Sequence, residues 1–335
     1  MRKRRFGRTG LEISELVLGG GIVGGILILK DEATRLEALE RAVGGGINWI
    51  DTAASYGNGV SETTIGRYLP ELSPRPMIST KARLEPADLA DIPGALTRAL
   101  EASLTRLKLE RVELLQLHNA LSEKPSGALS EKPSGGKLSL AHVLDPGGVA
   151  DAMDRLKAQG LIRAAGFTAL GETQACLRVI ESGRFESAQV YYNLLNPSAA
   201  WARAPAGWSA QDFSGLLAAC RRHDVAVMNI RSFAGGVLTG AAPHGREVSI
   251  TSGADPASEA SRARAVMALL GTSYGSPAQT ALRFSLTRPD LACVVVGIHE
   301  LAHLDEALAA VSLGPLPEAA ITALDALWRR DFRTD

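Results

Sequence analysis

Short β-rich runs alternate with amphipathic segments along almost the whole chain of 335 residues. Eight runs have the composition of strands, at residues 15–19, 48–52, 77–81, 112–118, 163–168, 188–192, 226–231 and 293–296. Segments with helical periodicity follow them, at residues 32–43, 62–69, 87–107, 149–159, 173–181, 214–223, 277–286 and 301–311. Continuous apolar runs such as Val294-Val295-Val296 are typical of parallel strands covered on both faces. Eight strand–helix repeats predict an α/β fold, a (β/α)8 TIM barrel.

Additional segments decorate this alternation. Residues 1–13 predict a small hairpin ahead of the first strand, and residues 317–332 predict a C-terminal amphipathic helix. Long loops are expected after strands four and seven, at residues 119–148 and 241–275, the second with a helix at 256–270. Loops that follow barrel strands lie at the face that carries the active site, so both are candidate substrate lids. We expect one domain over residues 1–335.

The loop after strand four contains a tandem repeat. The sequence Leu-Ser-Glu-Lys-Pro-Ser-Gly occurs at residues 121–127 and again at 129–135. A seven-residue duplication in a polar loop is most simply an insertion, and nothing in its composition predicts a role.

Charge and cysteine content exclude several classes of protein. The chain has 36 basic and 36 acidic residues and no net charge, so no general attraction to nucleic acid or an anionic membrane is expected. Three scattered cysteines predict neither a disulfide scaffold nor a zinc site, and no metal is expected. The apolar run at residues 16–29 is too short to span a bilayer and has no small-residue cleavage site. We therefore expect a cytoplasmic protein.

Ionisable residues close successive apolar strands. Asp51 ends the second strand, Lys81 the third and His118 the fourth, while Tyr56 follows shortly after Asp51. Each residue alone has an ordinary structural explanation. Because strand ends meet at one mouth of a barrel, however, their joint placement predicts that they gather there as a catalytic group.

Motifs spread over nearly the whole chain resemble the aldo-keto reductase family. They are Phe6-Gly7-Arg8-Thr9-Gly10-Leu11, Gly46-Ile47-Asn48-Trp49-Ile50-Asp51-Thr52-Ala53, Tyr56-Gly57 before Ser61-Glu62, Ser79-Thr80-Lys81-Ala82, Ser103-Leu104-Thr105-Arg106-Leu107, Leu115-Gln116-Leu117-His118 and Gly236-Val237-Leu238-Thr239-Gly240. The resemblance implies a catalytic tetrad of Asp51, Tyr56, Lys81 and His118. It also implies an NAD(P)-dependent oxidoreductase that interconverts an aldehyde, ketone or sugar with the corresponding alcohol.

The implied chemistry is physically coherent. Nicotinamide supplies a hydride to the carbonyl carbon, and Tyr56 supplies the proton to oxygen as general acid, or accepts it as general base in the reverse direction. A positively charged Lys81, held by Asp51, would favour the phenolate. His118 would steady the developing alkoxide.

The resemblance also implies a nucleotide site, for NADP(H) or NAD(H). Its expected contacts are Gly20, Gly21, Asp51, Thr168, Gln189, Arg231, Ser232, Phe233, Gly235, Leu238, Gly297, His299, His303 and Glu306. Gln189 would hold the nicotinamide amide, while Thr168 stands where the family has a serine. His303 lies near the place of the family's 2′-phosphate arginine, and a neutral imidazole holds a phosphate less firmly than a guanidinium. The preference between the two nucleotides is therefore open.

Three alternatives stay open beside a carbonyl reductase. One is an NAD-linked sugar or polyol dehydrogenase, and another is a nucleotide-binding regulatory barrel with little turnover. A two-domain dinucleotide-binding fold is the third, suggested by Gly19-Gly20-Gly21-Ile22-Val23-Gly24. That pattern needs a helix opening at its last glycine, whereas the helical periodicity here starts near Asp31. A small-molecule substrate is the expected partner, and the oligomeric state cannot be inferred.

Overall fold

Eight parallel strands close into a barrel in the computed structural model, which describes residues 1–124, 136–241, 245, 251 and 255–333. In chain order they are β3 (Leu16–Gly19), β4 (Trp49–Asp51), β5 (Met77–Ala82), β6 (Val112–Leu117), β9 (Ile162–Ala169), β10 (Ser187–Tyr191), β11 (Ala226–Ile230) and β12 (Cys293–Gly297). The barrel closes where β12 pairs in parallel with β3. The predicted (β/α)8 fold is confirmed.

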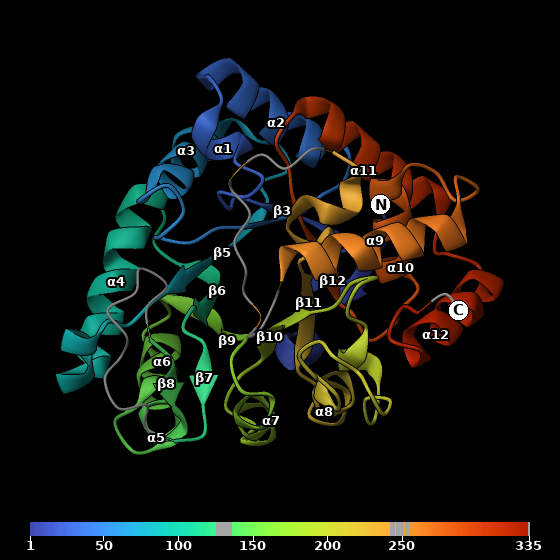
Figure 1. The fold of residues 1–335 in the computed structure, drawn as a ribbon. Helices are drawn as coiled ribbons and strands as arrows, with labels where there is room; N and C mark the ends of the chain where they lie inside the picture. The colour runs from blue at the N-terminus through green and yellow to red at the C-terminus, as the bar shows by residue number, and fades with distance from the viewer. Residues whose placement is uncertain (125–135, 242–244, 246–250, 252–254, 334–335) are drawn as a thin grey trace.

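Helices form an outer ring around these strands (Figure 1). They are α1 (Ile26–Leu29), α2 (Glu32–Gly44), α3 (Val60–Tyr68), α4 (Ile92–Leu107), α6 (Val149–Ala158), α7 (Thr173–Glu181), α8 (Leu216–Arg222), α10 (Pro277–Leu286) and α11 (Leu301–Leu313). The helix predicted at residues 87–107 is divided. A 3-10 turn at Pro86–Ala90 precedes α4, because the Asp91 side chain caps Gly94 N and a proline occupies the first turn.

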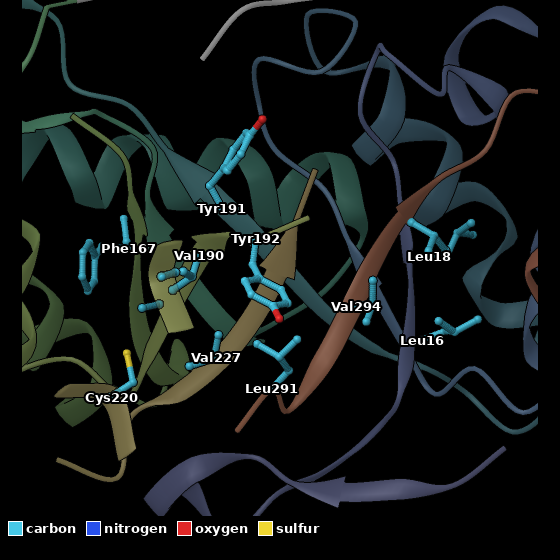
Figure 2. Packing of buried hydrophobic residues seen from close by; sticks show 14 of the residues in the cluster. Leu16, Leu18, Phe167, Val190, Tyr191, Tyr192, Cys220, Val227, Leu291 and Val294 are labelled. Carbon is cyan, nitrogen blue, oxygen red and sulfur yellow. The ribbon is translucent and has the colours of Figure 1, made fainter. Parts of the chain in front are cut away.

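Side chains of each strand alternate between two apolar cores. Ile50, Leu115 and Val227 point outward into the core between strands and helices, whereas Trp49 and Leu114 lie in the core inside the barrel. Figure 2 shows this outer core, to which Tyr191 and Tyr192 both belong although their rings point in opposite directions. The period of two therefore decides which strand residues reach the barrel interior.

The N-terminal hairpin closes one end of the barrel. Its strands β1 (Lys3–Arg5) and β2 (Glu12–Ser14) pair antiparallel, as predicted. Phe6 and Ile13 of this segment are fully buried in the interior core, where the Phe6 ring lies 4.9 Å from that of Trp49. The interior is thus apolar at the hairpin end, and its polar side chains gather at the opposite end.

The predicted polar loop at residues 119–148 is wrong in part. It contains a short parallel pair, β7 (Leu121–Ser122) and β8 (Leu138–Ser139), followed by α5 (Leu140–Leu144). Leu121 and Leu138 are fully buried, and this burial orders the two ends of the segment. Most of the repeated heptapeptide lies outside the described residues.

The second excursion contains α9 (Pro256–Leu270), the helix expected there. The C-terminal helix α12 (Glu318–Arg329) buries Leu324 and Trp328. The Trp201 and Trp208 rings pack on each other at 5.0 Å, and Trp201 lies 6.4 Å from Trp328. Within the described residues, no helix alone has the length and apolarity to cross a bilayer; only the bent pair α11 and α12 meets the test, by length and composition.

Candidate active site

A buried ion pair lies at the polar end of the barrel interior. Asp51 is the last residue of β4 and Lys81 lies in β5, and they are 2% and 1% exposed. Lys81 Nζ donates to Asp51 Oδ2 at 2.5 Å. Burial disfavours the ammonium, but the carboxylate of Asp51 and then Tyr56 outweigh it, so the pKa of Lys81 is raised. Lys81 is therefore a fixed cation at neutral pH.

The three hydrogens of the Lys81 ammonium have three acceptors. Besides Asp51, Nζ donates to the carbonyl oxygen of Thr52 at 2.9 Å and to the phenolic oxygen of Tyr56 at 3.2 Å. An ammonium has three donors and no more. The Tyr56 oxygen thus accepts from Lys81, and its own hydrogen must point elsewhere.

His118 follows the end of β6 and lies beside Tyr56. The two rings are 5.7 Å apart and nearly perpendicular, at 83°. Burial, with Lys81 and Arg83 as further causes, lowers the pKa of His118 to about 3. Its Nδ1 lies 3.4 Å from the Ser55 hydroxyl. A neutral imidazole in this place can donate one hydrogen bond without adding a charge.

Asp51 accepts more hydrogen bonds than the ion pair requires. Ser79 Oγ and Gln116 Nε2 donate to Oδ1 at 2.7 and 3.0 Å. Gln189 Nε2 donates to Oδ2 at 3.1 Å. Ser79 and Gln116 were not among the predicted site residues. The signal was parity, because they stand two positions before Lys81 and His118 and so point into the barrel with them.

On the other side of the same barrel mouth, Thr168 of β9 pairs in register with Gln189 of β10. Gln189 was predicted to contact the nucleotide. In the structure it lies at the mouth, and its amide donates to Asp51. The Thr168 hydroxyl is buried and has no hydrogen-bond partner among the described residues. An unpaired hydroxyl beside a carboxamide side chain fits a nicotinamide amide, which brings both donors and acceptors.

Glycines after β3 border the tetrad. Gly20 N donates to the carbonyl oxygen of Asp51 at 2.8 Å, and a Cβ on Gly20 would lie 2.4 Å from Ser61 Oγ. A Cβ on Gly21 would lie 3.5 Å from the Tyr56 ring. Gly21 therefore leaves space beside the phenol, whereas Gly20 is required by packing against Ser61.

The segment after β11 turns sharply. Arg231, Gly235 and Gly236 have φ of 61, 70 and 114°. Arg231 is held by the Asn193 amide, which donates to its carbonyl oxygen at 2.8 Å. Burial lowers the pKa of Arg231, while Tyr191, Tyr56 and Glu259 oppose that effect, so a guanidinium lies within electrostatic range of Tyr56.

The other predicted contacts of this segment differ in exposure. Ser232 and Leu238 are buried, and the Ser232 hydroxyl has no partner among the described residues. Phe233 is half-buried against the outer core, and its carbonyl oxygen accepts from Leu238 N at 3.1 Å. The unpaired hydroxyl of Ser232 and the two glycines Gly235 and Gly236 thus lie close together in sequence after β11.

The predicted adenosine contacts after β12 lie at the end of that strand and in the first two turns of α11. His299 Nδ1 lies 3.0 Å from the carbonyl oxygen of Gly24, next to the exposed Gly297. Glu306 accepts a hydrogen bond from the Ser276 hydroxyl, which caps α10. His303 is exposed. Glu306 therefore has a structural partner that its sequence position did not reveal.

Comparison with known proteins connects this geometry to a family. The model described as the aldo/keto reductase family matches residues 15–329. An uncharacterized oxidoreductase of Bacillus subtilis, YqkF, is 24% identical over 99% of this chain and 98% of its own length. D-threo-aldose 1-dehydrogenase of a Pseudomonas species is 28% identical over 63% of this chain and 66% of its own.

Solved structures share the fold. The holo form of an aldo-keto reductase from Bacillus halodurans matches with a TM-score of 0.72 and 21% identity, over 98% of this chain and 96% of that one. A glycerol dehydrogenase from Gluconobacter oxydans matches with a TM-score of 0.70 and 19% identity, over 98% and 95%.

Proposed function

The chain belongs to the aldo/keto reductase family and is an NAD(P)H-dependent oxidoreductase, and we propose that Tyr56 is its general acid/base. The observation that carries the proposal is the Lys81 ammonium, which donates at once to Asp51 and to the Tyr56 oxygen at 2.5 and 3.2 Å. With that oxygen accepting from Lys81, the phenolic hydrogen is directed toward the remaining open side. A carbonyl oxygen bound there would receive it.

The charge at this centre favours proton release. As Tyr56 gives its proton to the substrate oxygen, the phenolate stays beside a buried cation and is stabilised by it. His118 stays neutral because burial above all lowers its pKa to about 3, so it donates a hydrogen bond to the same oxygen. In the reverse direction Tyr56 accepts the proton from an alcohol.

The nucleotide supplies or accepts the hydride when it is bound. We assign the carboxamide to Thr168 and Gln189, because one carries an unpaired buried hydroxyl and the other reaches the tetrad. Gly21 leaves room beside Tyr56, and the turn from Arg231 through Ser232, Phe233, Gly235 and Leu238 lines the same mouth. Gly297, His299, His303 and Glu306 would hold the adenosine end, whereas Gly20, beside Asp51, would lie near the nicotinamide ring.

The substrate is a small carbonyl compound or its alcohol. A sugar or polyol oxidised with NAD is a second candidate, supported by the aldose dehydrogenase whose sequence is similar over 63% of this chain. His303 is exposed, and we expect it to bind a 2′-phosphate only weakly. We therefore propose NAD(H) as well as NADP(H) as the candidate nucleotide.

A turnover screen tests the proposal. Purified protein and its Tyr56→Phe variant would be mixed with NADH or NADPH and aldehydes and ketones, and with NAD or NADP and polyols, while the nicotinamide absorbance is followed. We expect turnover by the wild type and a loss of about 10²- to 10⁴-fold in Tyr56→Phe. Turnover that survives this substitution contradicts the role of Tyr56. Nucleotide binding without any turnover points instead to the regulatory barrel.

A further inference from the structure

Gln116 lies in the barrel interior at a place that the proposed proton transfer does not use directly. Its side chain is fully buried, and in register it pairs with Lys81 of β5 and Gly166 of β9. A Cβ on Gly166 would lie 3.1 Å from Gln116 Cγ. The neighbouring strand thus leaves the space that this long polar side chain fills.

The amide of Gln116 is only half satisfied. Nε2 donates to Asp51 Oδ1 at 3.0 Å, while the buried Oε1 has no partner in the described part of the chain. An ionised carboxylate only accepts hydrogen bonds, so the amide has to turn its nitrogen toward Asp51. An apolar side chain would avoid the cost of the unpaired oxygen, so the bond to Asp51 is what distinguishes glutamine here.

This bond acts on the oxygen of Asp51 that Lys81 does not contact. Ser79 donates to the same oxygen at 2.7 Å, and Trp49 Nε1 donates to Ser79 Oγ at 2.9 Å, which leaves the Ser79 hydrogen for Asp51. With Oδ1 held from two strands, the carboxylate cannot rotate freely. Its Oδ2 then fixes the Lys81 ammonium and, through it, the contact with Tyr56.

We propose that Gln116 is a positioning residue of the tetrad, which holds the Asp51 carboxylate in the orientation that keeps Lys81 on Tyr56. The role rests on the proposed function. Three other titratable groups lie around Asp51. Lys81 is a cation, Tyr56 is linked to Asp51 through the Lys81 ammonium, and His118 is neutral. Burial raises the pKa of the Cys293 thiol on β12 well above its usual range, so that group is also neutral.

Two substitutions of matched size separate this role from packing. Gln116→Met keeps the length but removes the donor, and we expect turnover to fall roughly 10- to 100-fold at every pH, as for a lost hydrogen bond to a charged group. In Gln116→Glu the introduced carboxyl donates to Asp51 only while protonated, and repels it once ionised. Its turnover relative to the wild type is therefore expected to fall as pH rises.

The measurement is the pH–rate profile of both variants, normalised to the protein that binds nucleotide, with the same substitutions at Gln174 as controls. Gln174 is exposed on α7 and is not one of the site residues. Wild-type turnover in Gln116→Met, or parallel pH profiles for the two variants, overturns the role of Gln116 alone. A wild type without turnover overturns the proposed function as well.

Discussion

The two halves of the barrel mouth are organised differently. Around β4 to β6, hydrogen bonds join Asp51, Lys81 and Tyr56 into one chain, although Gln116 Oε1 beside them has no partner among the described residues. Around β9 to β12, the expected nucleotide contacts include the unpaired hydroxyls of Thr168 and Ser232. A buried charge must be compensated within the protein, whereas a ligand site keeps polar groups for its ligand. The comparison predicts that substitutions in the first half cost stability, and that those in the second cost affinity.

The largest effect is expected from Lys81→Met. Without the ammonium, Asp51 is left as a buried and uncompensated carboxylate, so we expect the free energy of unfolding to fall by about 3–5 kcal/mol. Urea unfolding against the control Lys108→Met, at the exposed end of α4, measures it. An unchanged stability contradicts the view that this half is held together by charge.

A pH effect of about 2 kcal/mol is expected from His118. Its pKa, lowered to about 3 mainly by burial, keeps the folded state neutral while the unfolded imidazole takes up a proton below its usual value of 6.5. The unfolded state then binds more protons, so the stability falls as pH drops from 7 to 5, by up to about 2 kcal/mol. His118→Gln should lose less over that interval. Equal losses in both proteins contradict a partly buried imidazole that stays neutral in the folded state.

A mixed effect is expected from Gln189→Met, because this side chain connects the two halves. It donates to Asp51, and it is the proposed contact of the nicotinamide amide. We expect the Kd for nucleotide to rise about tenfold, which is about 1.4 kcal/mol, together with a loss of turnover. Gln116→Met should keep the wild-type Kd. A titration that finds the two variants alike removes the distinction between the halves.

The smallest effect, with opposite signs for stability and affinity, is expected from Thr168→Val. The substitution keeps the shape and removes an unpaired buried hydroxyl, so stability should rise by about 1 kcal/mol. Nucleotide affinity should fall about fivefold, which corresponds to a loss of about 1 kcal/mol of binding free energy. A thermal melt and a nucleotide titration measure both. A destabilised variant would show that the hydroxyl has a structural role.

The sequence predicted the barrel, and the gathering of Asp51, Tyr56, Lys81 and His118 at its mouth, because both leave strong signals. Eight apolar runs mark strands covered on both faces, and Asp51, Lys81 and His118 are ionisable residues that close such runs. The Gln116 and Ser79 contacts were missed because parity places these side chains in the barrel interior, whereas their contact with Asp51 of another strand depends on the register between strands. The bond from Ser276 to Glu306 joins segments 30 residues apart, and no local pattern reports it. The pairing of β7 with β8 was missed for the same reason.

Binding of the nucleotide tests the central claim most directly, that a nicotinamide site adjoins the Tyr56 centre. Wild-type protein and Tyr56→Phe would be titrated separately with NADH and NADPH while tryptophan fluorescence is followed. The account predicts saturable binding of at least one nucleotide, with the same Kd in both proteins, because Tyr56 acts on the substrate oxygen. Folded wild-type protein that binds neither nucleotide would contradict it.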